Sequence, residues 1–245
     1  MLRTSTDAAR LTHRRVVGVV LAGAVMLSVG CEEVPSSPFP AAHRPVAPIV
    51  SDAFSTEDAR DRVGEAEAVI AATGVQPGMW VADIGAGEGY YTVRLSPVVG
   101  PKGRVLAQDI VPEVRDRLAE RVQRDGLENV AVRLGLPDDP KLPANSFDRI
   151  FLVHMYHEVT NPYAFLWHLR TGLKDGGSIV VVDADRPIRR HGTPPALLDC
   201  EFASVGLERI GGQAIGGTDS YIALYRAARA RPEPSAMKAC PNPDG

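Results

Sequence analysis

Short apolar runs alternate with amphipathic stretches along most of the chain. From residue 57 to residue 72, apolar side chains recur at helical spacing, and Gly74 follows as a stop signal. The next run, residues 79–84, is too short for a helix and therefore predicts a buried strand. The same alternation predicts helices over 90–98, 112–124, 163–173 and 195–205, and strands over 104–109, 130–134, 147–153 and 178–183.

Two strands are then expected in succession. Residues 207–213 and 220–226 both have strand patterns, and the Gly-rich loop between them is short enough for a hairpin. Strands that alternate with helices indicate a parallel sheet covered on both faces, and a terminal hairpin adds antiparallel pairing. We therefore expect an α/β fold with a doubly wound, mostly parallel seven-stranded sheet and a C-terminal antiparallel hairpin.

The first 30 residues follow another pattern. Residues 1–15 are basic, and the uncharged apolar run 16–29 has about 14 residues, which is typical of a signal-peptide core and short for a membrane span. The run ends at Gly30-Cys31, which resembles a bacterial lipoprotein signal, although Ser28 stands where such signals prefer a large aliphatic residue. We expect export, to the periplasm or as a membrane-anchored lipoprotein lipidated on Cys31. Cleavage without lipidation and an uncleaved N-terminal anchor remain alternatives. If residues 1–30 are not a signal peptide, a cytoplasmic location is expected.

Composition then sets the expected boundaries. Residues 32–51 contain five prolines, which exclude a helix or an inner strand and indicate an extended tether. Residues 230–245 contain four prolines and few apolar side chains. The expected organisation is a signal peptide, a Pro-rich tether, one domain and a disordered tail, over residues 1–30, 31–51, 52–229 and 230–245.

Charge argues against one class of partner. The net charge is −3, and the first 30 residues hold four arginines against one acid, so the remainder is more acidic than the whole chain. An acidic domain gives no electrostatic reason to bind nucleic acid. We expect contact with a membrane only through the N-terminal segment.

The chain has three cysteines. If Cys31 is lipidated, Cys200 and Cys240 remain in an oxidising compartment and could pair. Alternatively, Cys200 is a small core residue and Cys240 a free thiol on the tail. Three dispersed cysteines show no metal-site spacing, so we expect no metal.

A glycine-rich loop follows the first predicted strand of the domain. Residues 81–90 are VADIGAGEGY, in which Gly85, Gly87 and Gly89 form G-x-G-x-G after Asp83. A dinucleotide site would need G-x-G-x-x-G. The pattern resembles class I methyltransferases, which use S-adenosylmethionine. The resemblance implies that Asp83 lies near the amino group of that cofactor and that the three glycines pass beneath its methionine and ribose.

Further features of the resemblance cover residues 55–226. Asp109 lies about 20 residues after the glycine loop, at the end of a predicted strand, where an acid can accept both ribose hydroxyls. Ile110 would pack on the adenine. Ser146-Phe147-Asp148 fits the start of the family's fourth strand. The adenine-side acid would be Asp138 or Asp139, and the alternative for both is a solvated loop.

The acceptor would bind after the fourth strand, beside His154-Met155-Tyr156-His157-Glu158. Methyl transfer needs mainly positioning, and a base only where the acceptor must lose a proton. His157 is the candidate base and Tyr156 the candidate residue to shape the pocket, with Glu158 orienting the base or simply solvated. The basic loop 183–191 could hold an acidic acceptor, or it is a solvated loop.

These observations predict an enzyme that uses S-adenosylmethionine to methylate a small-molecule acceptor that the sequence does not identify. One difficulty is that this cofactor is made in the cytoplasm, whereas the N-terminus predicts export. The alternatives are therefore an exported non-catalytic module that binds S-adenosylmethionine or a nucleotide and, less favoured by the glycine spacing, an NAD-dependent oxidoreductase.

Overall fold

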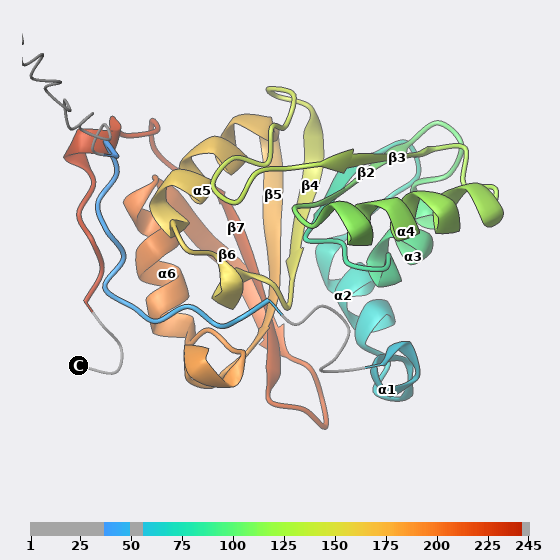
Figure 1. Ribbon diagram of the computed structural model, residues 1–245, viewed down its shortest axis with the longest axis horizontal. Helices are drawn as coiled ribbons and strands as arrows, with labels where there is room; N and C mark the ends of the chain where they lie inside the picture. The colour runs from blue at the N-terminus through green and yellow to red at the C-terminus, as the bar shows by residue number, and fades with distance from the viewer. Residues whose placement is uncertain (1–36, 50–55, 242–245) are drawn as a thin grey trace, which may run out of the picture. The chain divides into compact units, whose positions relative to one another are not determined.

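The computed structural model describes residues 37–49 and 56–241 (Figure 1). The predicted signal peptide and Cys31 lie outside the described residues. Within those residues, no helix combines the length and the apolar character that a membrane crossing requires.

One seven-stranded sheet forms the centre of the molecule, in the order β3-β2-β1-β4-β5-β7-β6. Strands β1 to β5 pair in parallel, and β7 pairs antiparallel with both β5 and β6. The strands are β1 (Trp80–Ile84), β2 (Arg104–Asp109), β3 (Val130–Leu134), β4 (Phe147–Val153), β5 (Leu173–Ala184), β6 (Leu207–Ala214) and β7 (Ser220–Ala227). The predicted fold class is confirmed, including the terminal hairpin. Chain order reverses between β1 and β4, where a parallel sheet offers a ligand crevice.

Helices cover both faces of this sheet (Figure 1). They are α1 (Glu57–Arg62), α2 (Glu65–Thr73), α3 (Tyr90–Val99), α4 (Pro112–Arg124), α5 (Pro162–Leu169) and α6 (Pro195–Ser204). Side chains of α2 and α3 form one core cluster with alternate residues of the central strands, such as Val81 and Val180. Side chains of α5 and α6 form the other cluster, with the intervening strand residues such as Ala82 and Ile179. Successive side chains of a strand point to opposite faces of the sheet, so each central strand contributes residues to both clusters.

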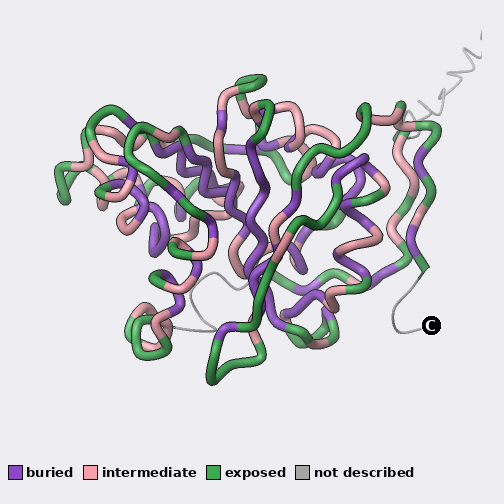
Figure 2. Tube along the Cα trace, turned by 180° about the vertical axis from the view of Figure 1, so that it is seen from behind, coloured by how far each residue is buried: buried purple, intermediate pink, exposed green. Residues whose placement is uncertain are grey.

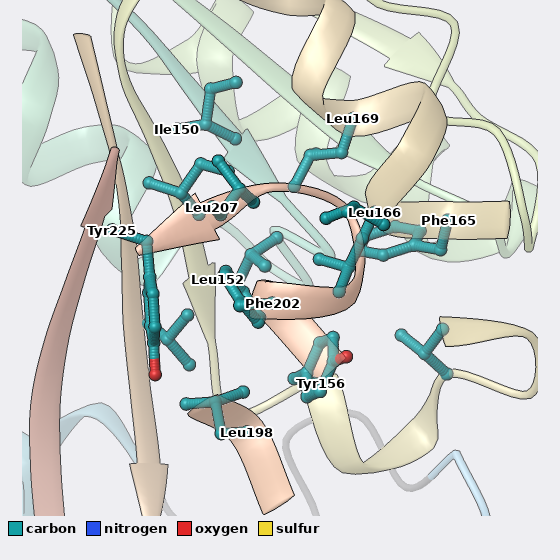
Figure 3. Packing of buried hydrophobic residues seen from close by; sticks show 14 of the residues in the cluster. Ile150, Leu152, Tyr156, Phe165, Leu166, Leu169, Leu198, Phe202, Leu207 and Tyr225 are labelled. Carbon is teal, nitrogen blue, oxygen red and sulfur yellow. The ribbon is translucent and has the colours of Figure 1, made fainter. Parts of the chain in front are cut away.

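The central strands are buried on both faces, whereas the outer loops and the ends of the hairpin are exposed (Figure 2). In the α5 and α6 layer, Phe202 packs against Tyr225 with 4.1 Å between ring centroids (Figure 3). Tyr156 lies in the same cluster, with its ring 5.5 Å from that of Phe202. This layer therefore includes residues that follow β4, such as Tyr156 and Val159.

Two predicted helices differ from the observed ones. The helix expected over 57–72 is divided into α1 and α2, because Gly64 takes a left-handed conformation with φ +62°. The helix expected over 163–173 ends as α5 at Leu169, and one turn of 3₁₀ helix leads into β5, which starts at Leu173 instead of Ser178. Residues 170–177, RTGLKDGG, contain one large apolar side chain, so neither the helical nor the strand period could locate this boundary.

The segment predicted as a disordered tail packs on the domain as far as it is described. Cys240 forms a disulfide with Cys200 of α6. Trp167 donates a hydrogen bond to the carbonyl of Pro232, and the Arg231 guanidinium lies 3.5 Å from the Trp167 ring centroid. The tail prediction was wrong for residues 230–241, because a covalent bond and an aromatic contact replace the missing apolar content. Of the two alternatives for the cysteines, the structure shows the pair.

Part of the predicted tether also packs on the domain. Residues 37–49 contain no helix or strand, as their prolines indicate, but Arg44 is buried. Its Nε donates a 2.8 Å hydrogen bond to Glu201 of α6, and its Nη2 donates to the carbonyl of Val159. The backbone N–H of Ala47 donates to the carbonyl of His157. We call residues 37–49 the N-terminal strap, and it supports the loop that follows β4.

Candidate functional site

A cavity of about 470 Å³ opens at the carboxyl ends of β1, β2 and β4, where chain order in the sheet reverses. This volume is within the range of small-molecule sites. Two groups of residues form much of its lining. We call the wall formed by the loop after β1 and the end of β2 the glycine-loop half, and the wall formed by the loops after β4 and β5 the histidine half.

The glycine loop follows β1, and its backbone conformation is energetically unfavourable for residues other than glycine. Gly85, Gly87 and Gly89 have φ values of +67°, +56° and +92°. A Cβ on Gly85 would lie 2.9 Å from Cγ of Met155, so a side chain there would also close the cavity between its two halves. Gly85 and Gly87 line the cavity, whereas Gly89 does not. Gly89 instead lets α3 begin close to Leu118 of α4.

Asp83 ends β1 on the cavity wall and is 3% exposed. Thr92 of α3 donates a 2.7 Å hydrogen bond to its carboxylate. Burial raises the pKa of Asp83 to about 6, although Thr92 and the nearby Arg60 act in the opposite direction. A carboxylate with this pKa favours a cationic ligand group, because the cation would restore its charged form.

Asp109 ends β2 and joins that strand to the glycine loop. Its Oδ2 accepts the Gly87 N–H at 3.0 Å, and its Oδ1 accepts the Val111 N–H at 2.9 Å. Each carboxylate oxygen can accept a second hydrogen bond, so the residue is able to bind hydroxyls as well. Ile110 also lines the cavity. The structure therefore brings Asp83, Asp109 and Ile110 together as the sequence predicted.

Gln108 is a residue of this half that the sequence analysis did not select. It lines the cavity and is 1% exposed, yet within the described part of the chain neither atom of its side-chain amide has a hydrogen-bond partner. Its amide packs on Gly135, where a Cβ would lie 1.2 Å from Nε2. A buried amide without partners carries a free-energy penalty that a ligand with both donors and acceptors removes. Nothing in the sequence distinguishes it from any other polar residue in a strand.

Asp138 does not line the cavity. Its carbonyl accepts a 2.8 Å hydrogen bond from Nδ1 of His168. Leu136 and Pro137 line the cavity in this region instead. The loop turns back on itself through paired backbone hydrogen bonds between Leu136 and Asp139, which directs the acids away from the cavity.

His157 and Asp183 form the centre of the histidine half. The ring is 3% exposed, and its Nδ1 lies 3.0 Å from Oδ1 of Asp183 at the end of β5. A carboxylate only accepts hydrogen bonds, so Nδ1 donates to Asp183, and in the neutral ring Nε2 carries the lone pair. Asp183 also accepts from the hydroxyl of Thr193 and from the N–H of Ala184, which fixes the carboxylate. Sequence analysis selected His157 but had no means to pair it with Asp183.

Tyr156 has a different environment from the one that the sequence suggested. It does not line the cavity and is 0% exposed. Its hydroxyl donates a 2.7 Å hydrogen bond to Glu201, which also pairs with Arg44 of the N-terminal strap. Burial raises the pKa of Glu201, and Arg44 opposes that change. Tyr156 thus anchors the loop whose next residue is His157, and it does not reach an acceptor.

The remaining polar residues of the histidine half come from both loops. Glu158, His191 and Arg186 line the cavity, whereas Arg189 and Arg190 are exposed and do not. His154 has φ +51°, and its Nε2 lies 3.1 Å from the carboxylate of Glu65. Burial would raise the pKa of Glu65, but His154 and Arg60 outweigh it and lower that pKa to about 2. The contact with Glu65 therefore holds His154 at the cavity edge.

The glycine-loop half fits the cofactor that the sequence resemblance implies. S-adenosylmethionine offers an ammonium group, a ribose diol and an adenine, and the wall offers a buried carboxylate, a second carboxylate and an unpartnered amide. Asp83 would hold the first, Asp109 the second and Gln108 the third. A Cβ-free backbone at Gly85 leaves room between them.

Comparison with known proteins supports the same cofactor, although it does not test the individual residues. Residues 82–181 match the family model described as a methyltransferase domain. The chain is also similar to the ubiquinone/menaquinone biosynthesis C-methyltransferase UbiE of Vibrio cholerae, with 27% identity over 167 residues. That alignment covers 68% of this chain and 63% of the Vibrio protein. The chain therefore matches somewhat less than two thirds of that relative's length.

Solved structures share the fold. A S-adenosylmethionine-dependent methyltransferase from Aquifex aeolicus has a TM-score of 0.64 and 27% identity, over 69% of this chain and 93% of that one. The [4+2]-cyclase SpnF has a TM-score of 0.61 and 15% identity, over 77% of this chain and 89% of its own, which shows the fold alone. The family and the Aquifex structure together imply S-adenosylmethionine as the cofactor.

Proposed function

Because this chain carries a class I, S-adenosylmethionine-dependent methyltransferase domain, we propose that it methylates a small-molecule acceptor outside the cytoplasm. The observation that carries the proposal is the cavity that joins the glycine-loop half to the histidine half. The glycine-loop half fits the methyl donor. The histidine half presents His157, supported by Asp183, to an acceptor bound beside the donor. The acceptor is not identified by the walls.

The chemistry needs little from the protein beyond placement. When bound, S-adenosylmethionine supplies an electrophilic methyl group on a sulfonium, which an acceptor nucleophile attacks in line. The glycine loop, Asp83 and Asp109 fix the position of the donor, and this positioning provides much of the rate. His157 activates the acceptor from the opposite wall through the lone pair on Nε2, while Asp183 keeps the ring in the required tautomer.

Export is the second part of the proposal. It is supported by the basic and apolar N-terminus ending in Gly30-Cys31 and by the Cys200–Cys240 disulfide, a bond that persists in oxidising compartments. We propose a periplasmic protein or a lipoprotein anchored through Cys31. The fold alone does not require transfer chemistry, as the cyclase with the same architecture illustrates.

Binding and transfer can be tested separately on the full-length protein. Calorimetry should show binding of S-adenosylmethionine and S-adenosylhomocysteine with Kd values on the order of micromolar, and no comparable binding of NAD. Methyl-labelled cofactor incubated with a cell-envelope extract should then label a small molecule. Binding of NAD alone would overturn the assignment, and cofactor binding without any labelled product would favour an exported non-catalytic module.

Localisation has its own test. Fractionation of cells that express the full chain should place it in the periplasm or the envelope. Cys31→Ser should release it from the membrane if a lipid on that residue is the anchor, whereas Cys240→Ser should leave its location unchanged. Recovery of the wild-type protein in the cytoplasm would contradict the export proposal without affecting the cofactor assignment.

A further inference from the structure

Three side chains that commonly bind metal ions meet in the histidine half of the cavity. His157, Glu158 and His191 each place one donor atom within 4.8 Å of the other two. The first two follow β4 and the third lies in the loop after β5, so neighbouring strands bring them together at one edge of the sheet. No Cys or His spacing in the sequence indicates this group, because His191 lies more than 30 residues after the adjacent pair His157-Glu158.

The ring of His157 is prepared for a metal ion by its hydrogen bond. Histidine ligands usually donate their second ring N–H to a carboxylate or a carbonyl, which fixes the tautomer and makes the ligand nitrogen more basic. Nδ1 of His157 has this bond to Asp183, at 3.0 Å, so Nε2 is the nitrogen that remains for a ligand.

The same carboxylate also positions His191. Thr193 donates a 2.7 Å hydrogen bond from its hydroxyl to Oδ2 of Asp183, and its N–H donates to the carbonyl of Ala184. These bonds fix the short turn in which His191 takes a left-handed conformation, with φ +57°. Such a conformation is uncommon for histidine and is maintained only where the surroundings impose it. One buried acid therefore supports both imidazoles.

We propose that His157, Glu158 and His191 bind a first-row divalent metal ion of the zinc type. Two imidazoles and one carboxylate are a known ligand set for catalytic zinc, with an open position for water or substrate. A tetrahedral ion with bonds of about 2.1 Å holds its ligands about 3.4 Å apart, so side-chain rotation has to draw the three donors slightly closer. All three residues line the cavity, so the open position faces the space left for the acceptor.

The consequence for catalysis rests on the proposed function. With a metal bound, Nε2 of His157 is a ligand and does not take a proton. The metal would instead bind an acceptor oxygen and lower its pKa, so that the oxygen loses its proton more readily before methylation. The acceptor class that fits is a small molecule with a hydroxyl or enol group.

The test uses the full-length protein after removal of metal with EDTA. Co²⁺ is titrated by absorbance and Zn²⁺ by calorimetry, for the wild type and for His191→Asn and Glu158→Gln. Asparagine tolerates the left-handed conformation at position 191 better than most residues, so that variant should keep its backbone. His168→Asn and Glu113→Gln are the matched controls, because neither residue lines the cavity.

One Zn²⁺ per chain is expected for the wild type and both controls. Affinity should fall at least ~10-fold in each site variant. The Co²⁺ complex should show the intense visible bands of low coordination number. Absence of binding at about 100 µM metal, or equal affinity in the wild type and both site variants, would overturn the proposal.

Two further readings keep this proposal distinct from the proposed function. Calorimetry with S-adenosylmethionine reports on the glycine-loop half, and its Kd should change less than about twofold in His191→Asn. A protein that binds the cofactor but no metal refutes the metal site alone. A protein that binds metal but no cofactor refutes the methyl-transfer proposal and leaves the metal site in place.

Discussion

The two halves of the cavity are built in different ways. In the glycine-loop half, the contacts come from a segment of about 30 residues, Trp80–Ile110, and backbone groups define much of its shape. In the histidine half, His157 depends on Asp183, on Thr193 and, through Tyr156, on Glu201 and Arg44. The first half is a local motif, whereas the second is assembled from residues far apart in the chain. Substitutions should therefore separate donor binding from transfer.

The largest effect is expected at Gly85. Gly85→Val places a branched side chain at φ +67° and against Met155, so it should abolish detectable binding of S-adenosylmethionine. Gly176→Val is the matched control, since Gly176 has φ +76° but a Cβ there would meet no described atom within 4 Å beyond its chain neighbours. Calorimetry measures binding, and thermal unfolding shows whether both variants fold. Normal binding in Gly85→Val would mean that the cofactor lies elsewhere.

The next effect concerns the histidine half. Asp183→Asn offers an amide in place of a carboxylate, which no longer fixes the His157 tautomer. We expect methyl transfer to fall ~100- to 10,000-fold, while the Kd for the cofactor stays within about twofold. Asp185→Asn, on the exposed part of the same loop, should change neither quantity. An equal loss of binding and transfer in Asp183→Asn would show that the two halves are coupled.

A smaller effect is expected at Asp109. Asp109→Ala removes a charged acceptor that fixes Gly87 and can reach the ribose, so the affinity should fall ~10- to 100-fold. Asp116→Ala on the outer surface of α4 provides the control. Once saturated with cofactor, the variant should keep its rate of transfer to within about threefold. A loss of rate at saturation would contradict a role limited to donor binding.

The smallest effect is a pH dependence. Burial raises the pKa of Asp83 to about 6, and a bound ammonium group stabilises its charged form. Affinity for S-adenosylmethionine should therefore rise with pH, by at most ~10-fold per unit below pH 6, and level off above it. Asp83→Asn should bind more weakly and show no such rise between pH 5 and 7. A flat profile in the wild type would mean that Asp83 does not face the cation.

This contrast also explains what the sequence could predict. For six of the seven strands, including the two of the hairpin, the predicted bounds agree with the observed ones within about a residue. The fifth strand was also predicted, but from residue 178, whereas β5 begins at Leu173. Asp83, Gly85, Gly87, Asp109 and Ile110 were selected from a continuous motif after β1 and from the end of the neighbouring strand β2, and all five line the cavity. Their roles toward the cofactor stay predictions. Gln108 has no such signal, because it stands out only in the folded chain, where its buried amide has no hydrogen-bond partner among the described residues.

The histidine half was predictable only in part. His157 was selected from its position after β4, but Asp183 and His191 come close to it only when β4 and β5 pair. Tyr156 was chosen by adjacency, but in the 3₁₀ turn Tyr156–Glu158 its side chain packs on Glu201, whereas the next residue, His157, lines the cavity. The packing of residues 230–241 depends on a disulfide whose formation the sequence left open.

The disulfide has a practical consequence for how the protein is prepared. Cys200 is the neighbour of Glu201, the acid that holds both Tyr156 and Arg44 beneath the histidine half. In a host cytoplasm, where thiols stay reduced, the bond would be absent and α6 would lose its covalent link to residue 240. Such material would still bind the methyl donor, because the glycine-loop half is held by contacts among β1, β2, α3 and α4. The histidine half would be less firmly held, because its support from α6 would be weaker. A protein prepared in the cytoplasm and an oxidised one should therefore differ in their turnover rates.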